Sequence, residues 1–411
     1  MKPKIRFKGF EGEWKTEDFQ NSFDSLRNNS LSRAELADDG KIANIHYGDV
    51  LIKFSECIDT SVDKLTYILD NEIGKNLVKN GALKRGDIIF ADAAEDNTVG
   101  KCSELLCKDN ELIVSGLHTI ACRPRLNVAE KYLGYYLNSP AYHNQLLPHI
   151  QGTKISSISK KAINTTFVVF PTQKAEQQAI ASYFTSLDSQ ISASTSRLAS
   201  LKQMKAASLQ AMFPQEGETV PKIRFKGFEG EWKKVKLGKL FSERIENNVD
   251  GEMLSVTMNN GIIKAAENGR FDNSNSDKSK YKVVKVGDIA YNSMRMWQGA
   301  SGCSQYEGIV SPAYTVVVPN ANIHSLFFAY LFKTIPMINL FRLHSQGLTK
   351  DTWNLKYPAF SIIEVSYPES KAEQQAIASY FTSLDRQISL QSQRLEKLKQ
   401  IKSACLDKMF V

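Results

Sequence analysis

The sequence predicts a mixed α/β protein in which two similar globular domains are separated by two long antiparallel coiled-coil helices. The segment KAEQQAIASYFTSLD occurs at residues 174–188 and again at 371–385, and PKIRFKGFEGEWK occurs at residues 3–15 and 221–233. The blocks between them differ, but matching anchors keep their order, such as GDIIFADA (86–93) and GDIAYNSM (287–294). One duplicated fold with a near-identical frame and diverged contents explains this pattern.

The two long repeated segments are expected to be helices. Their apolar residues recur at steps of three and four, and in the first copy they are Ile180, Phe184, Leu187, Ile191, Leu198 and Leu201. This heptad spacing predicts the narrow seam of a coiled coil. A helix from Gln173 to Met212 would be roughly 60 Å long at 1.5 Å per residue. The seam would next fall on Lys205 and Lys402, but Met204 and Ile401 are the apolar residues there, which suggests a local change of packing.

The order of the repeats divides the chain into five segments. We assign residues 1–170 to the first globular domain, 171–213 to the first long helix, 214–220 to a linker, 221–368 to the second domain and 369–411 to the second long helix. If the halves share a fold, the C-terminus should lie near the N-terminus, as Phe213 lies near Pro221. The chain would then be pseudo-cyclic, with a two-fold axis between its halves. The first block is the longer one, mainly before Gly86.

The composition is that of a soluble globular protein, with 42% hydrophobic and 23% charged residues. The net charge of +8 is compatible with nucleic-acid binding. No run of about 18 apolar residues exists, so no membrane span is expected. The start of the sequence lacks an apolar signal core, and the six cysteines are scattered, which together predict a cytoplasmic protein.

Motifs for catalysis are missing from the sequence. There is no Pro-Pro of the kind that amino-methyltransferases use, no complete phosphate-binding loop and no G-x-G-x-x-G. The six histidines form no H-E-x-x-H, and Cys102 and Cys107 have no matching pair for zinc. Asp87 and Asp288 stand in paired Gly-Asp-Ile turns, where an aspartate that caps a turn is favoured over a metal ligand. A basic, repeated frame without catalytic motifs points to recognition, and duplex DNA is itself two-fold.

The sequence resembles the specificity subunit of type I restriction-modification systems over essentially all of its length. The resemblance rests on the Ala-Glu-Gln-Gln-x-Ile opening of both long segments after Pro171 and Pro368. It also rests on the Gly-Asp-Ile strands at residues 86–88 and 287–289 and on the segment HYGDV at residues 46–50.

The resemblance implies a non-catalytic subunit. Each variable block would be a target-recognition domain that reads one half of a split, asymmetric site in double-stranded DNA. The helices would set the number of unread base pairs and dock two modification subunits, and restriction subunits would join the full complex. No cofactor is expected on this chain, whereas S-adenosylmethionine, ATP and Mg are expected on the partner subunits.

Candidate DNA-binding residues lie in polar loops with interleaved basic and aromatic side chains. Arginine can bind guanine and Gln or Asn can bind adenine in a bidentate manner, whereas lysines contact phosphates. In the first domain the candidates are Gln151, Thr153, Lys154, Ser156, Lys160 and Lys161. In the second domain they are Asn292, Arg295, Trp297, Gln298, Gln346, Thr349, Lys350 and Trp353. Trp14 and Trp232 belong to the identical segments, so we assign them to the structure, where they could also help to hold the modification subunits.

Other functions remain open at this point. The chain could be the recognition part of a related enzyme that both cuts and methylates DNA. It could also be a coiled-coil scaffold whose domains bind protein or RNA, and only the protein-binding version would lack a steep dependence of affinity on salt. A self-sufficient enzyme would need a cofactor site that the sequence does not reveal.

Overall fold

The computed structural model describes residues 1–258, 260–268 and 277–411. Two compact units make up the chain: Met1–Ser194 with Arg394–Val411, and Thr195–Gln393. The division falls inside the two long helices, α7 (Lys174–Ala211) and α11 (Lys371–Lys408). Each unit therefore contains the start of one long helix and the end of the other.

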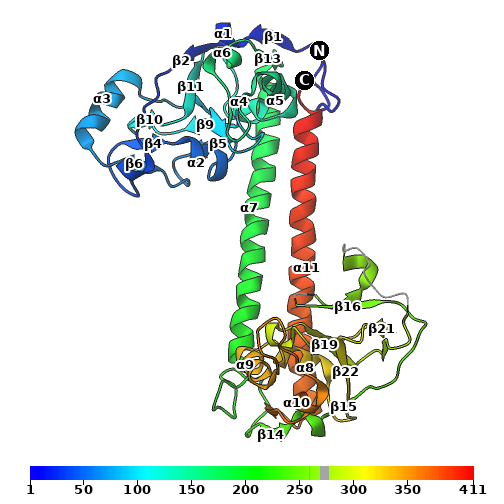
Figure 1. Cartoon of the computed structure of the whole chain (residues 1–411). Coiled ribbons are helices and arrows are strands. Elements are labelled where there is room, and N and C mark those ends of the chain that lie inside the picture. The colour runs from blue at the N-terminus through cyan, green and yellow to red at the C-terminus, as the bar shows by residue number, and fades with distance from the viewer. Residues whose placement is uncertain (259, 269–276) are drawn as a thin grey trace. The chain divides into compact units, whose positions relative to one another are not determined.

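The first unit is a mixed α/β structure (Figure 1). Its other elements in chain order are β1 (Lys15–Asp18), α1 (Phe19–Ser22), β2 (Phe23–Ser25), β3 (Leu36–Ala37), β4 (Ala43–Ile45), α2 (Tyr47–Ile52), β5 (Cys57–Asp59), β6 (Thr66–Ile68), α3 (Asn71–Gly81), β7 (Ile88–Ala91), β8 (Ala93–Ala94), β9 (Cys102–Leu106), β10 (Ile113–Ser115), β11 (Thr119–Pro124), α4 (Tyr132–Leu137), α5 (Pro140–Leu146), β12 (Ser156–Ser157), α6 (Lys160–Ile163) and β13 (Phe167–Phe170).

The core of the first unit is built on a five-stranded sheet in the order β2-β11-β7-β9-β5. The sequence IIFA of β7 is apolar throughout because this strand lies between β11 and β9 and is buried on both faces. A four-stranded sheet has the order β10-β4-β6-β3, and three of its strands, β3, β4 and β6, come from the longer part of the chain before Gly86. The additional residues of the first block thus form β6 and α3 among other elements.

The second unit repeats this plan in a shorter form. Its elements are β14 (Lys233–Lys236), β15 (Phe241–Glu243), β16 (Leu254–Thr257), β17 (Gly261–Lys264), β18 (Lys282–Val284), β19 (Ile289–Asn292), β20 (Ser301–Cys303), β21 (Gly308–Val310), β22 (Tyr314–Pro319), α8 (Ser325–Leu331), α9 (Ile335–His344), α10 (Tyr357–Ser361) and β23 (Glu364–Tyr367). The central sheet has the order β15-β22-β19-β20, in which β19 corresponds to β7. The mixed α/β class and the duplication are confirmed.

Within each unit the two long helices run antiparallel. In the first unit Lys402 pairs with Asp188 at 2.6 Å, and Tyr183 lies 3.4 Å from the sulfur of Cys405. In the second unit Lys205 pairs with Asp385 at 2.5 Å, and the hydroxyls of Ser208 and Tyr380 are 2.9 Å apart. Because the residue numbers rise on one helix as they fall on the other, the predicted antiparallel packing is confirmed in each unit.

The predicted change of the seam is wrong at Met204, whereas Ile401 in the other helix is partly buried against the core of the first unit. The seam residues Phe184 and Leu201 are buried as expected, but the side chain of Met204 is about half exposed. Lys205 keeps the seam position because its ammonium lies over the ring of Tyr330 and reaches Asp385, and Lys402 does the same over Tyr135. The long lysine side chain packs its methylene groups inward and places its charge beside a carboxylate.

The short repeated segments close each unit. The guanidinium of Arg6 binds the carboxylate of Glu176 through two hydrogen bonds of 2.7 and 2.8 Å, and Arg224 binds Glu373 in the same way. The Glu176 side chain is almost fully buried, and a bidentate arginine is the partner that best satisfies such a carboxylate. These pairs tie the short segment to the first turn of a long helix in both units.

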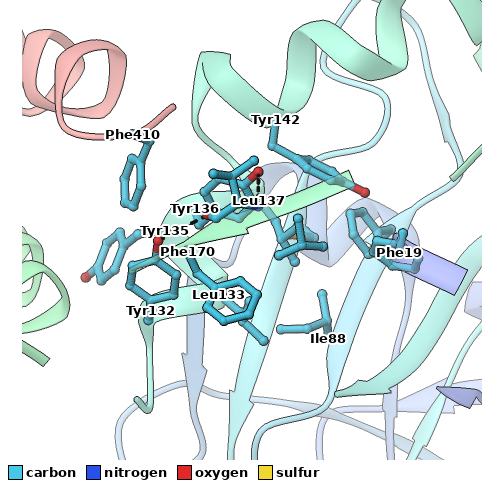
Figure 2. Close-up of a cluster of buried hydrophobic side chains, with 14 of the residues drawn as sticks. Phe19, Ile88, Tyr132, Leu133, Tyr135, Tyr136, Leu137, Tyr142, Phe170 and Phe410 are labelled. Atoms are coloured by element: carbon cyan, nitrogen blue, oxygen red, sulfur yellow. Dashed lines mark hydrogen bonds between the residues drawn. The ribbon is translucent and has the colours of Figure 1, made fainter. Parts of the chain in front are cut away.

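Aromatic packing around the chain ends is also repeated. In the first unit the ring of Phe410 contacts the rings of Tyr132 and Tyr136, with centroids 5.8 and 5.7 Å away (Figure 2). It also stacks on the ring of Phe184 at 5.7 Å. Both termini of the sequence lie in this unit, as the pseudo-cyclic arrangement requires. Trp14 is buried beside Phe410, and Trp232 is buried beside Phe213, which confirms the structural assignment of the two tryptophans.

The Gly-Asp-Ile turns are built as expected. The carboxylate of Asp87 accepts a 2.7 Å hydrogen bond from the amide of Lys84, and Asp288 accepts one of 2.8 Å from Lys285. Asp87 also pairs with Arg123, as Asp288 pairs with Arg244. These aspartates therefore cap turns inside buried ion pairs.

Candidate nucleic-acid interface

The first candidate loop spans residues 151–157 and is closed by its own backbone. The amide of Gln151 donates to the carbonyl of Ser157 at 3.0 Å, and the amide of Ser157 donates back at 2.7 Å. Gly152 has a φ of +105°, and a Cβ atom there would lie 2.0 Å from the carbonyl oxygen of Ile155. Only glycine fits this turn, so the loop leaves the fold with a defined shape.

The second candidate loop, residues 346–354, has the same closure. Gln346 and Asn354 exchange backbone hydrogen bonds of 3.0 and 2.8 Å. Gly347 has a φ of +150°, and a Cβ atom there would lie 2.6 Å from the carbonyl oxygen of Thr352. The hydroxyl of Thr352 donates to the carbonyl of Thr349 at 2.9 Å, which further stabilises the tip. The enclosed segment is longer than in the first loop, so the two frames present different surfaces.

Each loop is anchored to the turn that follows the central strand of its sheet. The amide of Ile158 donates to the carbonyl of Asp92 at 2.9 Å, and the amide of Leu355 donates to the carbonyl of Ser293 at 2.8 Å. Asp92 follows β7 and Ser293 follows β19. Two segments far apart in the sequence thus lie side by side at the same place in both units.

The candidates of the first unit gather around this loop. Gln151, Thr153 and Lys154 are exposed, whereas Ser156 lies half-buried in β12, where it pairs with β8. Lys160 and Lys161 are exposed at the start of α6, after the N-cap residue Ser159. They continue the chain directly from the loop and add two positive charges beside it.

The candidates of the second unit come from both sides of the anchor. Arg295 and Gln298 are exposed on the turn after β19, and the oxygen of the Asn292 side chain accepts the amide of Met294 at 3.0 Å. Gln346, Thr349 and Lys350 are exposed on the loop.

Trp297 joins Trp353 in an edge-to-face contact with centroids 5.3 Å apart. The indole N–H of Trp297 donates to the carbonyl of Met294 at 3.1 Å. The tryptophan pair therefore ties the loop to the turn and is half-buried in doing so.

Two kinds of residue in these places were missed by sequence reasoning. One is the apolar residue at each loop, Ile155 and Leu348, both of which are strongly exposed. The choice of polar types passed over them, although their position after a Gln-Gly pair was a usable signal.

The other missed group is a polar cluster in the first unit. The imidazole of His118 lies 3.0 Å from the carboxylate of Asp92 and 5.3 Å from the ring centroid of Tyr47. Burial raises the pKa of Asp92, and the neighbouring His118 partly offsets this shift. His118 has a φ of +53°, a backbone conformation that no sequence pattern announces.

Ion pairs and polar loops make up these surfaces in the described parts of the chain. Among residues 1–258, 260–268 and 277–411, no three His, Cys, Asp or Glu side chains gather in a way that could hold a metal ion. The six cysteines are free thiols. In the same residues no single helix is long and apolar enough to cross a membrane, although the bent pair α8 and α9 passes by length and composition together.

Comparison with known proteins identifies the class. The family model of the type I restriction modification DNA specificity domain matches residues 19–203 and again residues 229–400. The chain belongs to this family, and its function is the recognition of DNA sequence in a type I restriction-modification system.

Solved structures agree in fold. The S subunit of a type I restriction-modification system from M. genitalium is 14% identical with a TM-score of 0.59, and the match covers 100% of this chain and 99% of that one. A chain from a study of complex assembly and conformational transition of the type I R-M system is also 14% identical, with a TM-score of 0.53 and coverage of 97% and 98%. No curated protein sequence matches.

Proposed function

We propose that each unit reads one half of a split, asymmetric site in double-stranded DNA, through the Gln-Gly loop and the turn to which it is anchored. The observation that carries this proposal is the pair of loops 151–157 and 346–354. They have the same closure and the same anchor, but they differ in length and in the residues that they expose. A constant frame with variable tips is what two different half-sites require.

The charges fit a division of labour between positioning and reading. Lysines at the loops, Lys154, Lys160 and Lys350, suit phosphate contacts that position the protein without reading sequence. Arg295 and Gln298 are exposed on the neighbouring turn and carry the side chains that pair with guanine and adenine edges. The recognition domains are proposed to span residues 1–170 and 221–368, as the repeats indicate.

The long helices are proposed to set the number of unread base pairs. Each has 38 residues, which is about 57 Å at 1.5 Å per residue and more than the roughly 34 Å of one DNA turn. Both helices pass from one unit to the other. A change in helix length would therefore change the spacer of the recognised site.

Exposed residues that are identical in both repeats are proposed to dock two modification subunits. Ile5 is 46% exposed and Ile223 is 59% exposed, although both are apolar. Gln178 and Gln375 are exposed at the same point of each long helix. Residues that neither fill the core nor differ between half-sites have a simple role as a surface for two copies of one partner.

The chain is proposed to be non-catalytic and to act in the cytoplasm. Methylation would be carried out by the modification subunits with S-adenosylmethionine. Restriction subunits with ATP and Mg would join the full complex.

The test is base-resolution mapping of adenine methylation in cells that express this chain with its candidate modification subunit, against cells without the chain. We expect a split motif that disappears when the chain is absent. A matched strain carries the variant Lys350→Ala, which should keep the motif and lower its occupancy. Methylation that is unchanged by loss of the chain, in a demonstrated complex, would overturn the proposal and favour a scaffold.

A further inference from the structure

The second unit contains a large groove at a place that the first unit fills with one of its own side chains. It has a volume of about 980 Å³ and is lined by the C-terminal part of α7, the middle of α11, helix α8 and the strands β17 and β20. Lys202, Lys205 and Lys333 line it, and among the described residues the carboxylate in the lining is that of Asp385. The groove is therefore cationic, and it also has apolar walls that include Leu209, Ile262 and Ile388.

The repeat supplies an internal comparison for this groove. Lys402 in the first unit occupies the position of Lys205 in the second, since both lie in the repeated sequence at the same register. Lys402 binds two carboxylates, Asp188 at 2.6 Å and Glu56 at 2.7 Å. Lys205 binds the equivalent of Asp188, which is Asp385, and the described residues around it provide no equivalent of Glu56.

Exposure and charge differ accordingly. The side chain of Lys402 is 16% exposed, whereas that of Lys205 is 29% exposed. Burial alone would lower the pKa of Lys402, but the carboxylates of Glu56 and Asp188 raise it above its ordinary value. The chain itself fills this space in the first unit with an acidic side chain.

Both units place a second lysine within electrostatic range of the seam lysine, Lys101 beside Lys402 and Glu56 in the first unit and Lys333 beside Lys205 in the second. Tyr135 and Tyr330 are equivalent, since each donates a hydrogen bond to the aspartate of its unit, Asp188 or Asp385. Three residues after each tyrosine the first unit has Asn138 and the second has Lys333. The ammonium of Lys333 donates to the carbonyls of Met258 and Gly299, and within residues 1–258, 260–268 and 277–411 no carboxylate forms an ion pair with it. Burial, followed by the charge of Lys205, lowers the pKa of Lys333 to about 8. Two lysines thus share one aspartate in a half-buried place.

We propose that this groove binds an acidic, partly apolar peptide segment of a partner protein, with a carboxylate placed between Lys205 and Lys333. The carboxylate would supply what Glu56 supplies in the first unit. A protein segment fits better than a DNA backbone because half of the lining is apolar. The groove belongs to the second unit alone, so it makes the two units unequal for a partner although their frames are the same.

The probe is a fluorescent hexapeptide, Glu-Leu-Glu-Glu-Leu-Glu, added to the full chain, with a peptide in which Gln replaces each Glu as its counterpart. We expect the acidic peptide to bind and the Gln peptide not to bind. The double variant Lys205→Met, Lys333→Met should weaken binding at least tenfold, and Lys399→Met, an exposed lysine of the first unit, should leave it unchanged. Equal binding to the double variant would overturn the proposal.

A second measurement keeps the test decisive if the double variant folds poorly. Acetylation of surface amines in the unmodified chain at pH 8 is followed by mass spectrometry with and without the peptide. Protection of Lys333, with Lys399 still reactive, supports the proposal. Protection of Lys333 by a short DNA duplex and not by the peptide would overturn it and assign the groove to phosphates.

Discussion

The amide of Ile5 donates a 2.9 Å hydrogen bond to the carbonyl of Lys408, and 218 residues further on the amide of Ile223 makes the same 2.9 Å bond with the carbonyl of Ala211. In the first unit this bond joins the two ends of the sequence, and in the second it joins neighbouring segments. The same local structure is therefore made once across a chain break and once along a continuous chain. The fold is pseudo-cyclic because the chain ends meet in the same local structure that the continuous chain forms in the second unit.

Removal of the Phe410 ring should destabilise the first unit alone. The ring packs against Tyr132, Tyr136 and Phe184, so Phe410→Ala leaves a cavity in an aromatic cluster and should cost about 3–5 kcal/mol. Amide hydrogen exchange should rise in α4 and leave α8 unchanged. The matched variant Phe213→Ala should have the reverse effect, and equal effects of both variants on both helices would contradict the description of two units.

The stability of the first unit should fall as the pH rises from about 4.5 to about 7. Burial raises the pKa of Glu104 from 4.5 to about 7, although the amides of Lys131 and Gly134 donate to its carboxylate. The folded state holds the proton more tightly than the unfolded state, so this stability is present below pH 4.5 and is lost as the pH passes through 7. The change is on the order of 3 kcal/mol.

Denaturant unfolding across this pH range measures the Glu104 effect. Glu104→Gln should remove this part of the pH dependence whatever its absolute stability, because glutamine does not titrate. The second unit is the internal control, since β20 has the sequence SGC and no carboxylate. A pH dependence that persists in the variant would rule out Glu104 as its source.

Gly347→Ala should impair recognition of one half-site only. The new Cβ atom would lie 2.6 Å from the carbonyl oxygen of Thr352, so the loop must change shape. We expect affinity for the target duplex to fall by about tenfold or more, roughly 1.4 kcal/mol. Footprinting should show protection lost over one half of the site, and Gly152→Ala should affect the other half. Loss over the same half in both variants would disprove the assignment of one loop to each half.

Lys350→Ala should weaken binding to all sequences to a similar extent. If Lys350 contacts a phosphate, the slope of log affinity against log salt should become shallower by about 0.9. Fluorescence anisotropy with target and non-target duplexes, at about 50 to 200 mM salt, measures the slope. Lys239→Ala, an exposed lysine outside the loop, is the control and should leave the slope unchanged.

The repeated short segments and long helices could be predicted from the sequence because each of them occurs twice. Duplication located both long helices, and the segments 171–213 and 369–411 contain α7 (Lys174–Ala211) and α11 (Lys371–Lys408) with two or three further residues at each end. Heptad spacing identified which face is buried. The pattern failed at Met204 because hydrophobic periodicity has no way of recognising that a lysine such as Lys205 can hold a seam position with its stem and a carboxylate.

The loops could be located from the sequence but not resolved. The Gln-Gly pair marked both of them, but the bond from Leu355 to Ser293 joins segments that no periodicity connects. His118 escaped notice because its backbone conformation depends on the packing of β10 and β11 around it. The groove beside Lys333 could not be foreseen either, since it arises from the absence of one carboxylate in a three-dimensional arrangement.

The division of the chain into units has a consequence for synthesis on the ribosome. The second unit is a continuous stretch, Thr195–Gln393, whereas the first needs Arg394–Val411 for the packing of Phe410 and the ion pair of Lys402. Translation delivers these residues after the whole second unit has been made. The half that is encoded first is therefore the half that finishes folding last. Until the C-terminal residues are made, the ring of Phe184 remains without its contact to Phe410.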